Sequence, residues 1–103
     1  MPESTDQLTG TASQIEWADE IRPRVRAEFD RVAAAFGRVA ERQGAAARAE
    51  TMAVLEILAE KRAEVMAQRS AGYFIRDWQE LAGQVRTMIA ADPRYQAMKG
   101  RGV

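Results

Sequence analysis

The sequence predicts an all-α protein that folds as a three-helix antiparallel bundle with a short C-terminal helix. Apolar residues recur at alternating steps of four and three, which is the period of a helix with one buried face. Two stretches carry this pattern most clearly, and they hold Val25, Phe29, Val32, Phe36 and Val39, then Phe74, Trp78, Leu81, Val85 and Met88. A chain of 103 residues, 47% of them hydrophobic, has room for one domain with one modest core.

The first long helix is expected to begin at about residue 11. Residues 1–10 mix Ser, Thr, Asp, Pro and Gly without periodicity, so they are predicted to form a flexible N-terminal arm. Thr11 and Gln14 have the spacing of a capping box. The helical phase then continues past Pro23 to about residue 43. Because proline removes one hydrogen bond and clashes with the preceding turn, we expect a kink at Pro23.

Two more long helices are expected over residues 46–69 and 73–91, with the interruption between them at residues 70–72. Gly44 is expected to end the first helix in the left-handed conformation. Asp92 and Pro93 then have the character of an N-cap and a first helical residue, which predicts a short helix to Lys99. Residues 11–99 therefore form one helical domain, and residues 100–103 are expected to fray.

The first helix is the longest of the three, so part of it should overhang the bundle. An overhang that bears Trp17, Phe29 or Phe36 needs to be covered. Two alternatives stay open at this point: the chain forms a homodimer through the overhang, or a partner protein binds there.

Composition excludes several classes of protein. The chain lacks cysteine, so it has no disulfide framework and no thiolate metal site, which suits the cytoplasm. No apolar run approaches a transmembrane length, and the acidic, polar start does not have the pattern of a secretory signal. Fifteen basic residues balance fifteen acidic ones, so the net charge attracts neither nucleic acid nor membrane. We expect a cytoplasmic protein without a membrane partner.

Catalytic chemistry finds little support. The chain has no histidine, the residue that most often serves as general acid or base. Glu16, Asp19 and Glu20 share a helix face and have a spacing that could hold a hard cation, but the same spacing is natural where acids stabilise the start of a helix. We predict that the protein is not an enzyme, has no catalytic residue, and binds no metal or cofactor.

Two short motifs carry a family resemblance. The opening is similar to that of small uncharacterised helical proteins of bacteria, phages and mobile elements, which has the form L-x-G-S-x-K-Q-I-x-W-A-x-x-I-R. The agreement is at Leu8, Gly10, Gln14, Ile15, Trp17, Ala18, Ile21 and Arg22. The stretch from Ser70 to Asp77 resembles, more loosely, a second motif of the same group, roughly S-A-x-W-W-I-D-N-R. The resemblance covers about a quarter of the chain and implies no activity.

The two motifs bring together most of the candidate binding residues. Trp17, Tyr73 and Phe74 can pack as one structural corner between the first and third helices. The functional alternative is an aromatic recognition pocket with Gln14 and Arg22 as its polar contacts. Aromatic and arginine side chains supply most interface hot spots, so Arg31 and Arg38 on the first helix complete the set of predicted partner-binding residues.

These features predict a non-enzymatic protein that acts by binding another protein. The resemblance suggests an origin in a phage or other mobile element, and a specific form of this role is an anti-CRISPR-like inhibitor of a host defence complex, which is a nucleoprotein. The alternative is a nucleic-acid-associated regulator that uses the arginine-rich helix 22–48, since arginine is well suited to phosphate and base contacts. Arginine enrichment also follows from a GC-rich coding sequence, and no nucleic-acid-binding motif is visible, so direct nucleic acid binding is the weaker prediction.

Overall fold

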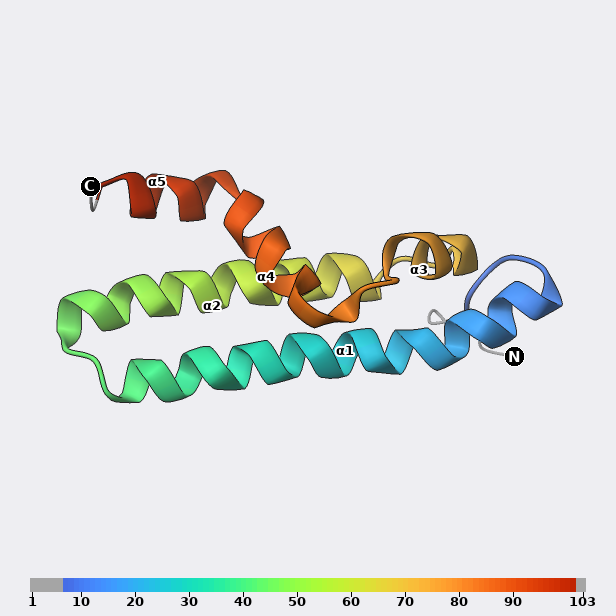
Figure 1. Ribbon diagram of the computed structural model, residues 1–103, viewed down its shortest axis with the longest axis horizontal. Coiled ribbons are helices and arrows are strands. Elements are labelled where there is room, and N and C mark those ends of the chain that lie inside the picture. The colour runs from blue at the N-terminus through green and yellow to red at the C-terminus, as the bar shows by residue number, and fades with distance from the viewer. Residues whose placement is uncertain (1–6, 102–103) are drawn as a thin grey trace, which may run out of the picture.

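The computed structural model describes residues 7–101, and this part of the chain is all-α (Figure 1). Its helices are α1 (Ala12–Glu41), α2 (Ala45–Met66), α3 (Ala71–Asp77), α4 (Leu81–Ala91) and α5 (Pro93–Arg101). Within residues 7–101 no β-strand forms, and an isolated parallel bridge joins Thr9 to Ser70. The all-α prediction is confirmed. None of the helices in this range combines the length and apolar character that a bilayer span requires.

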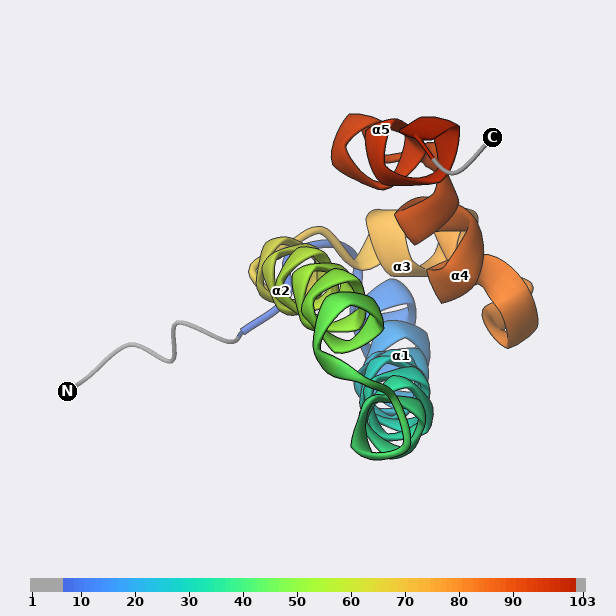
Figure 2. The same ribbon diagram turned by 90° about the vertical axis from the view of Figure 1, so that its left-hand side faces the viewer.

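The long helices α1 and α2 form an antiparallel hairpin and lie side by side in both views (Figures 1 and 2). The predicted capping box starts α1: the Gln14 amide N–H donates to Thr11 Oγ1 at 3.2 Å, and the Thr11 N–H donates to Gln14 Oε1 at 2.9 Å. The expectation for Gly44 was wrong. Gly44 has an extended backbone (φ −75°) and is the N-cap of α2. The end of α1 is closed instead by Arg48, whose guanidinium donates to the carbonyls of Ala40 and Gln43.

The helix α1 runs through Pro23 as one element of 30 residues, so the predicted kink is not confirmed. Pro23 is exposed. The carbonyl that a proline deprives of its helical partner therefore faces the water side, where water can satisfy it. At about 1.5 Å per residue, α1 spans most of the 49 Å long axis of the molecule. The exposed side of α1 therefore forms one continuous surface along most of the length of the molecule.

The third predicted helix is divided into α3 and α4, so five helices replace the expected four in the described part of the chain. The apolar period of residues 74–88 is uninterrupted, and Phe74, Trp78 and Val85 are all buried, as the pattern predicted. The backbone nevertheless leaves the helical conformation after Asp77, and again at Ala82 and Gly83, where Gly83 has φ +84°. The apolar period therefore predicted correctly which side chains are buried, but it wrongly predicted one continuous helix. A short break in the backbone that returns the next helix to the same face leaves the apolar period unchanged.

The N-terminal segment is tied to the folded body from Leu8 onward. Leu8 is 3% exposed and belongs to the core. The Thr9 N–H donates to the Arg69 carbonyl at 2.6 Å, and the Ala71 N–H donates to the Thr9 carbonyl at 2.8 Å. The expected arm of residues 1–10 was therefore too long at its C-terminal end. Residues 1–6 of that arm lie outside the described residues.

At the other end of the chain, α5 lies above α4, on the side of the molecule farthest from α1 (Figures 1 and 2). It begins at Pro93, as predicted, and Asp92 Oδ1 accepts the Arg94 backbone N–H at 2.8 Å. The helical backbone continues to Arg101, so residues 100 and 101, expected to fray, are helical. Residues 102–103 lie outside the described residues.

Candidate functional site

A hollow of about 370 Å³ lies where α1 meets α3 and the start of α4. Its lining is mainly apolar and consists of Trp17, Ile21, Arg24, Ile75, Trp78, Gln79 and Leu81. We call this feature the Trp17 groove. Trp17, Ile21 and Arg24 come from one face of α1, because steps of four and three residues return to the same side of a helix.

Trp17 forms an exposed wall of the groove. Its side chain is 58% exposed, which makes it one of three exposed large hydrophobic residues in the described chain, with Val39 at 49% and Met52 at 50%. Val39 lines a hollow with Ala35 and two arginines, whereas the hollow beside Trp17 has four further apolar side chains, those of Ile21, Ile75, Trp78 and Leu81. Exposing an indole beside an apolar hollow leaves a large hydrophobic area in water, and such a patch typically marks a binding surface.

The floor of the groove is rigid because Trp78 is fixed on several sides. Trp78 is 3% exposed, and its indole N–H donates to the Tyr73 hydroxyl at 3.1 Å. Its ring packs at a tilt against Phe29, with 5.7 Å between the ring centroids. Tyr73 in turn meets Phe74 edge to face at 5.1 Å. Packed aromatic pairs of this geometry restrict side-chain motion, so the groove is largely formed before anything binds.

The predicted binding residues do not gather at one site. Trp17 lines the groove, and Tyr73 supports it from below through Trp78. Phe74 is fully buried, and Gln14 is occupied by the capping box at the start of α1. Arg38 lies near the other end of α1, beside a separate hollow with Ala35, Val39 and Arg42.

Arg22 and Arg31 also have structural partners. Arg22 is 8% exposed, donates to the Met66 carbonyl at the end of α2, and lies over the Phe74 ring with its guanidinium carbon 5.9 Å from the centroid. Arg31 pairs with Glu28 one turn earlier on α1, and this pairing lowers the pKa of Glu28. The structural alternative placed Trp17, Tyr73 and Phe74 in one packed corner. Phe74 is buried and Tyr73 is half-buried, but Trp17 is exposed at the groove.

The sequence analysis missed Arg24, Ile75 and Leu81 as lining residues of the groove. Leu81 lies on the apolar stripe of residues 74–88, where edge positions and core positions look the same. Arg24 follows Trp17 by seven residues, which places both on one helix face, and that spacing could have identified it.

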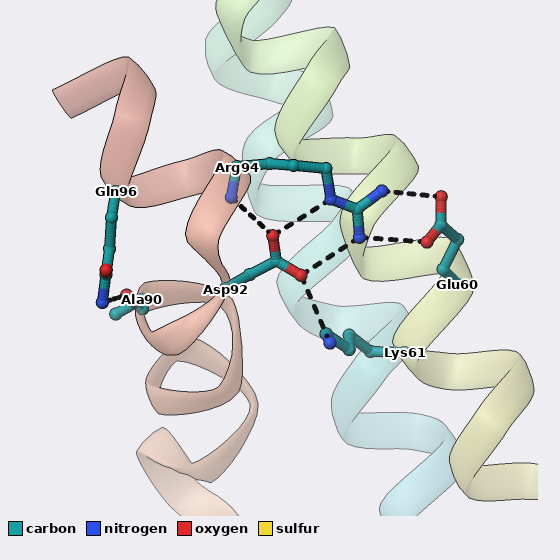
Figure 3. Close-up of polar contacts among 6 residues, drawn as sticks. All are labelled: Glu60, Lys61, Ala90, Asp92, Arg94 and Gln96. Atoms are coloured by element: carbon teal, nitrogen blue, oxygen red, sulfur yellow. Dashed lines mark hydrogen bonds and ion pairs between the residues drawn. The ribbon is translucent and has the colours of Figure 1, made fainter. Parts of the chain in front are cut away.

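The strongest electrostatic perturbation lies away from the groove, where the α4–α5 junction meets α2 (Figure 3). The Asp92 carboxylate, 4% exposed, accepts hydrogen bonds from Arg94 at 2.8 Å and 3.0 Å and pairs with Lys61 at 3.2 Å. Arg94 also binds Glu60 through two bonds of 3.0 Å. These contacts lower the pKa of Asp92 far below its ordinary value, with the Arg94 side chain as the main cause. The charges of this cluster satisfy one another, which is the arrangement of a structural clamp.

Neither the cluster around Asp92 and Arg94 nor the Trp17 groove has the donor set of a metal site. Across the described residues no three acidic, histidine or cysteine side chains come close enough to share an ion. The acids of the first α1 turns, which the sequence singled out for a hard cation, are exposed on that helix.

Comparisons with protein-family models, with curated proteins and with solved structures give no match. The functional argument is therefore built on the geometry of the Trp17 groove and on the chemistry of the residues around it.

Proposed function

We propose that this protein binds a partner protein through the Trp17 groove and carries out no chemistry of its own. The observation that carries the proposal is a tryptophan that is 58% exposed at the edge of an apolar hollow of about 370 Å³. Tryptophan and arginine are the residues most enriched among interface hot spots, and Trp17 and Arg24 are neighbours here.

The lining also indicates what kind of segment the groove accepts. Ile21, Ile75 and Leu81 offer an apolar surface for a side chain of leucine or phenylalanine size. The Arg24 guanidinium and the Trp17 indole N–H are donors without acceptor capacity. The complementary segment therefore presents a large apolar side chain with a carboxylate or carbonyl acceptor beside it.

Support for a purely binding role comes from the composition and from the ion-pair cluster around Asp92. The chain contains neither histidine nor cysteine. Asp92, the carboxylate with the most strongly lowered pKa, is engaged by Arg94 and Lys61, which is typical of a structural ion pair.

The nucleic-acid alternative receives less support from the arrangement of the arginines of residues 22–48. Arg22 is buried, Arg48 closes the end of α1, and Arg31 is paired with Glu28. The exposed Glu20 and the half-buried Glu28 lie among the remaining arginines of α1. A continuous basic surface, which phosphate binding requires, is thus interrupted by acids.

The narrower proposal of a phage or mobile-element inhibitor of a host defence complex rests on the sequence resemblance. Trp17 and Ile21 belong both to the resembling motif and to the groove. This overlap is the reason to look for the partner among such complexes first.

A photo-crosslinking amino acid at position 17 tests the proposal in the native host cell. The matched control carries the same group at position 52, because Met52 is exposed to a similar extent but lies on α2 away from the groove. We expect a discrete protein adduct at position 17 and none at position 52. Ile75→Glu, which places a charge in the hollow, should abolish the adduct. Equal adducts at both positions would contradict the proposal, and a nuclease-sensitive adduct would favour nucleic acid.

A further inference from the structure

The last helix, α5, is not closely packed against the rest of the molecule. None of the side chains described for α5 is buried: Tyr95 and Met98 are half-buried, and the others are exposed. A hollow of about 110 Å³ lies between these two side chains and the α1–α2 hairpin, where its lining includes Phe36, Thr51 and Val54. Since protein interiors normally leave few voids larger than a water molecule, this hollow marks incomplete packing of α5 on the hairpin.

Among the described side chains, one polar contact joins α5 to the hairpin. The Arg94 guanidinium donates two hydrogen bonds of 3.0 Å to Glu60 of α2 (Figure 3). Both side chains are about half exposed, at 52% for Arg94 and 54% for Glu60. Exposed ion pairs stabilise a fold only weakly and are screened by salt. The Arg94–Glu60 pair is therefore a weak latch on α5.

The junction between α4 and α5 is held more firmly. Asp92 is the one residue between these helices, and its side chain is 4% exposed. It accepts hydrogen bonds from the backbone and the side chain of Arg94 and pairs with Lys61 at 3.2 Å. Pro93 keeps the preceding residue extended, with ψ 131° at Asp92. A rotation at this single extended residue moves α5 as a unit, and the bonds between Asp92 and Arg94 can persist because the two residues are near neighbours.

We infer that α5 is a hinged cover of the hairpin, which swings away about Asp92 as one helix while α1–α4 stay folded. Opening breaks the Arg94–Glu60 pair and frees the two half-buried side chains of α5. Segments with few buried apolar contacts open locally at much lower free energy than the whole domain unfolds. Because the latch is an exposed ion pair, the open population should increase with ionic strength.

The open form exposes surface that the closed form hides. Phe36 is half-buried and Val54 is 5% exposed, and both lose the cover of Tyr95 and Met98 when α5 swings away. This hollow shares no lining residue with the Trp17 groove, so the inference goes beyond the proposed function. Access to the apolar surface beneath α5 therefore depends on the latch.

Single cysteines test the inference, because the natural chain has none. Val54→Cys places a thiol beneath α5. Val65→Cys is the matched control, since Val65 lies on the same helix and is 3% exposed but does not line the hollow. The reaction rate of a covered thiol with a chromogenic disulfide reagent follows the fraction of molecules in which it is uncovered. We expect the thiol at position 54 to react at least about tenfold faster than the thiol at position 65.

A second substitution in each cysteine variant tests the latch. Glu60→Gln removes its negative charge, so the rate at position 54 should increase about threefold and the rate at position 65 should stay unchanged. Glu56→Gln makes the same change in net charge one turn earlier on α2, at an exposed residue, and should alter neither rate. Raising the salt concentration about tenfold should reproduce the effect of Glu60→Gln.

Circular dichroism verifies that each variant is folded. Equal rates at positions 54 and 65 would overturn the inference, because the hairpin surface would then be uncovered only by global unfolding. Equal effects of Glu60→Gln and Glu56→Gln would also overturn it, since the Arg94–Glu60 pair would not hold the cover. Either result would leave the crosslink at position 17, and hence the proposed function, unaffected.

Discussion

Replacing Leu58 by alanine should destabilise the protein strongly, because Leu58 is 2% exposed in the core between α1, α2 and α4. The change removes three carbon atoms, and at about 0.8 kcal/mol per buried carbon the transfer contribution alone is about 2.4 kcal/mol. The residual cavity adds a further cost in a close-packed interior, which brings the expected loss to about 3–4 kcal/mol. A small domain has about 5–15 kcal/mol of stability in total, so this loss is a large share.

Urea denaturation followed by circular dichroism measures the effect, with Met52→Ala as the control. Met52 is six residues earlier on α2 and is 50% exposed, so its replacement should cost no more than about 0.5 kcal/mol. With a typical slope of about 1–3 kcal/mol per molar urea, Leu58→Ala should lower the midpoint by roughly 1–4 M. Equal midpoints for the two variants would refute the placement of Leu58 in the core and the orientation of α2.

Three further perturbations test other parts of the fold. The pKa of Asp92 is lowered from its ordinary value of 3.8, so the charged carboxylate stabilises the fold above about pH 4, and this stabilisation is lost as the pH falls further. Asp92→Asn should therefore lower the melting temperature at pH 7. The difference in melting temperature between this variant and the natural chain should shrink below about pH 4. Gly83→Ala should cost about 1 kcal/mol in urea denaturation, since a β-carbon meets nothing within 4 Å and the positive φ alone opposes it. Pro23→Ala should raise the free energy of unfolding by about 1–3 kcal/mol, because α1 is already continuous and alanine restores the backbone N–H that proline lacks. A loss of stability in this variant would indicate that the proline shapes the helix.

The helical class and much of the core could be predicted from the sequence because burial follows the helical period. Val25, Phe29 and Val32 lie on the predicted stripe of α1, and all three are fully buried. The local end signals were equally informative, since Thr11 and Asp92 form the predicted contacts at helix starts. Each of these signals depends on residues that are near one another in the chain.

The features that the sequence did not predict depend on contacts between distant segments. The backbone bonds between Thr9 and the α2–α3 connection leave no mark in local composition. The location of α5 is fixed by Arg94 bridging to Glu60, a pair 34 residues apart. The candidate site was predicted only in part. Trp17 was among the predicted partner-binding residues, but its neighbours in the groove, Ile75 and Leu81, come from another part of the chain.

The central claim, that Trp17 anchors a partner protein, is tested most directly by the affinity of the partner that the position-17 crosslink captures. Isothermal titration calorimetry should compare the natural chain with Trp17→Ala and Met52→Ala, two variants that each shorten an exposed apolar side chain. A hot-spot tryptophan contributes about 2 kcal/mol or more, so Trp17→Ala should weaken binding at least about thirtyfold, while Met52→Ala should leave the dissociation constant unchanged. Equal affinities for all three proteins would contradict the claim.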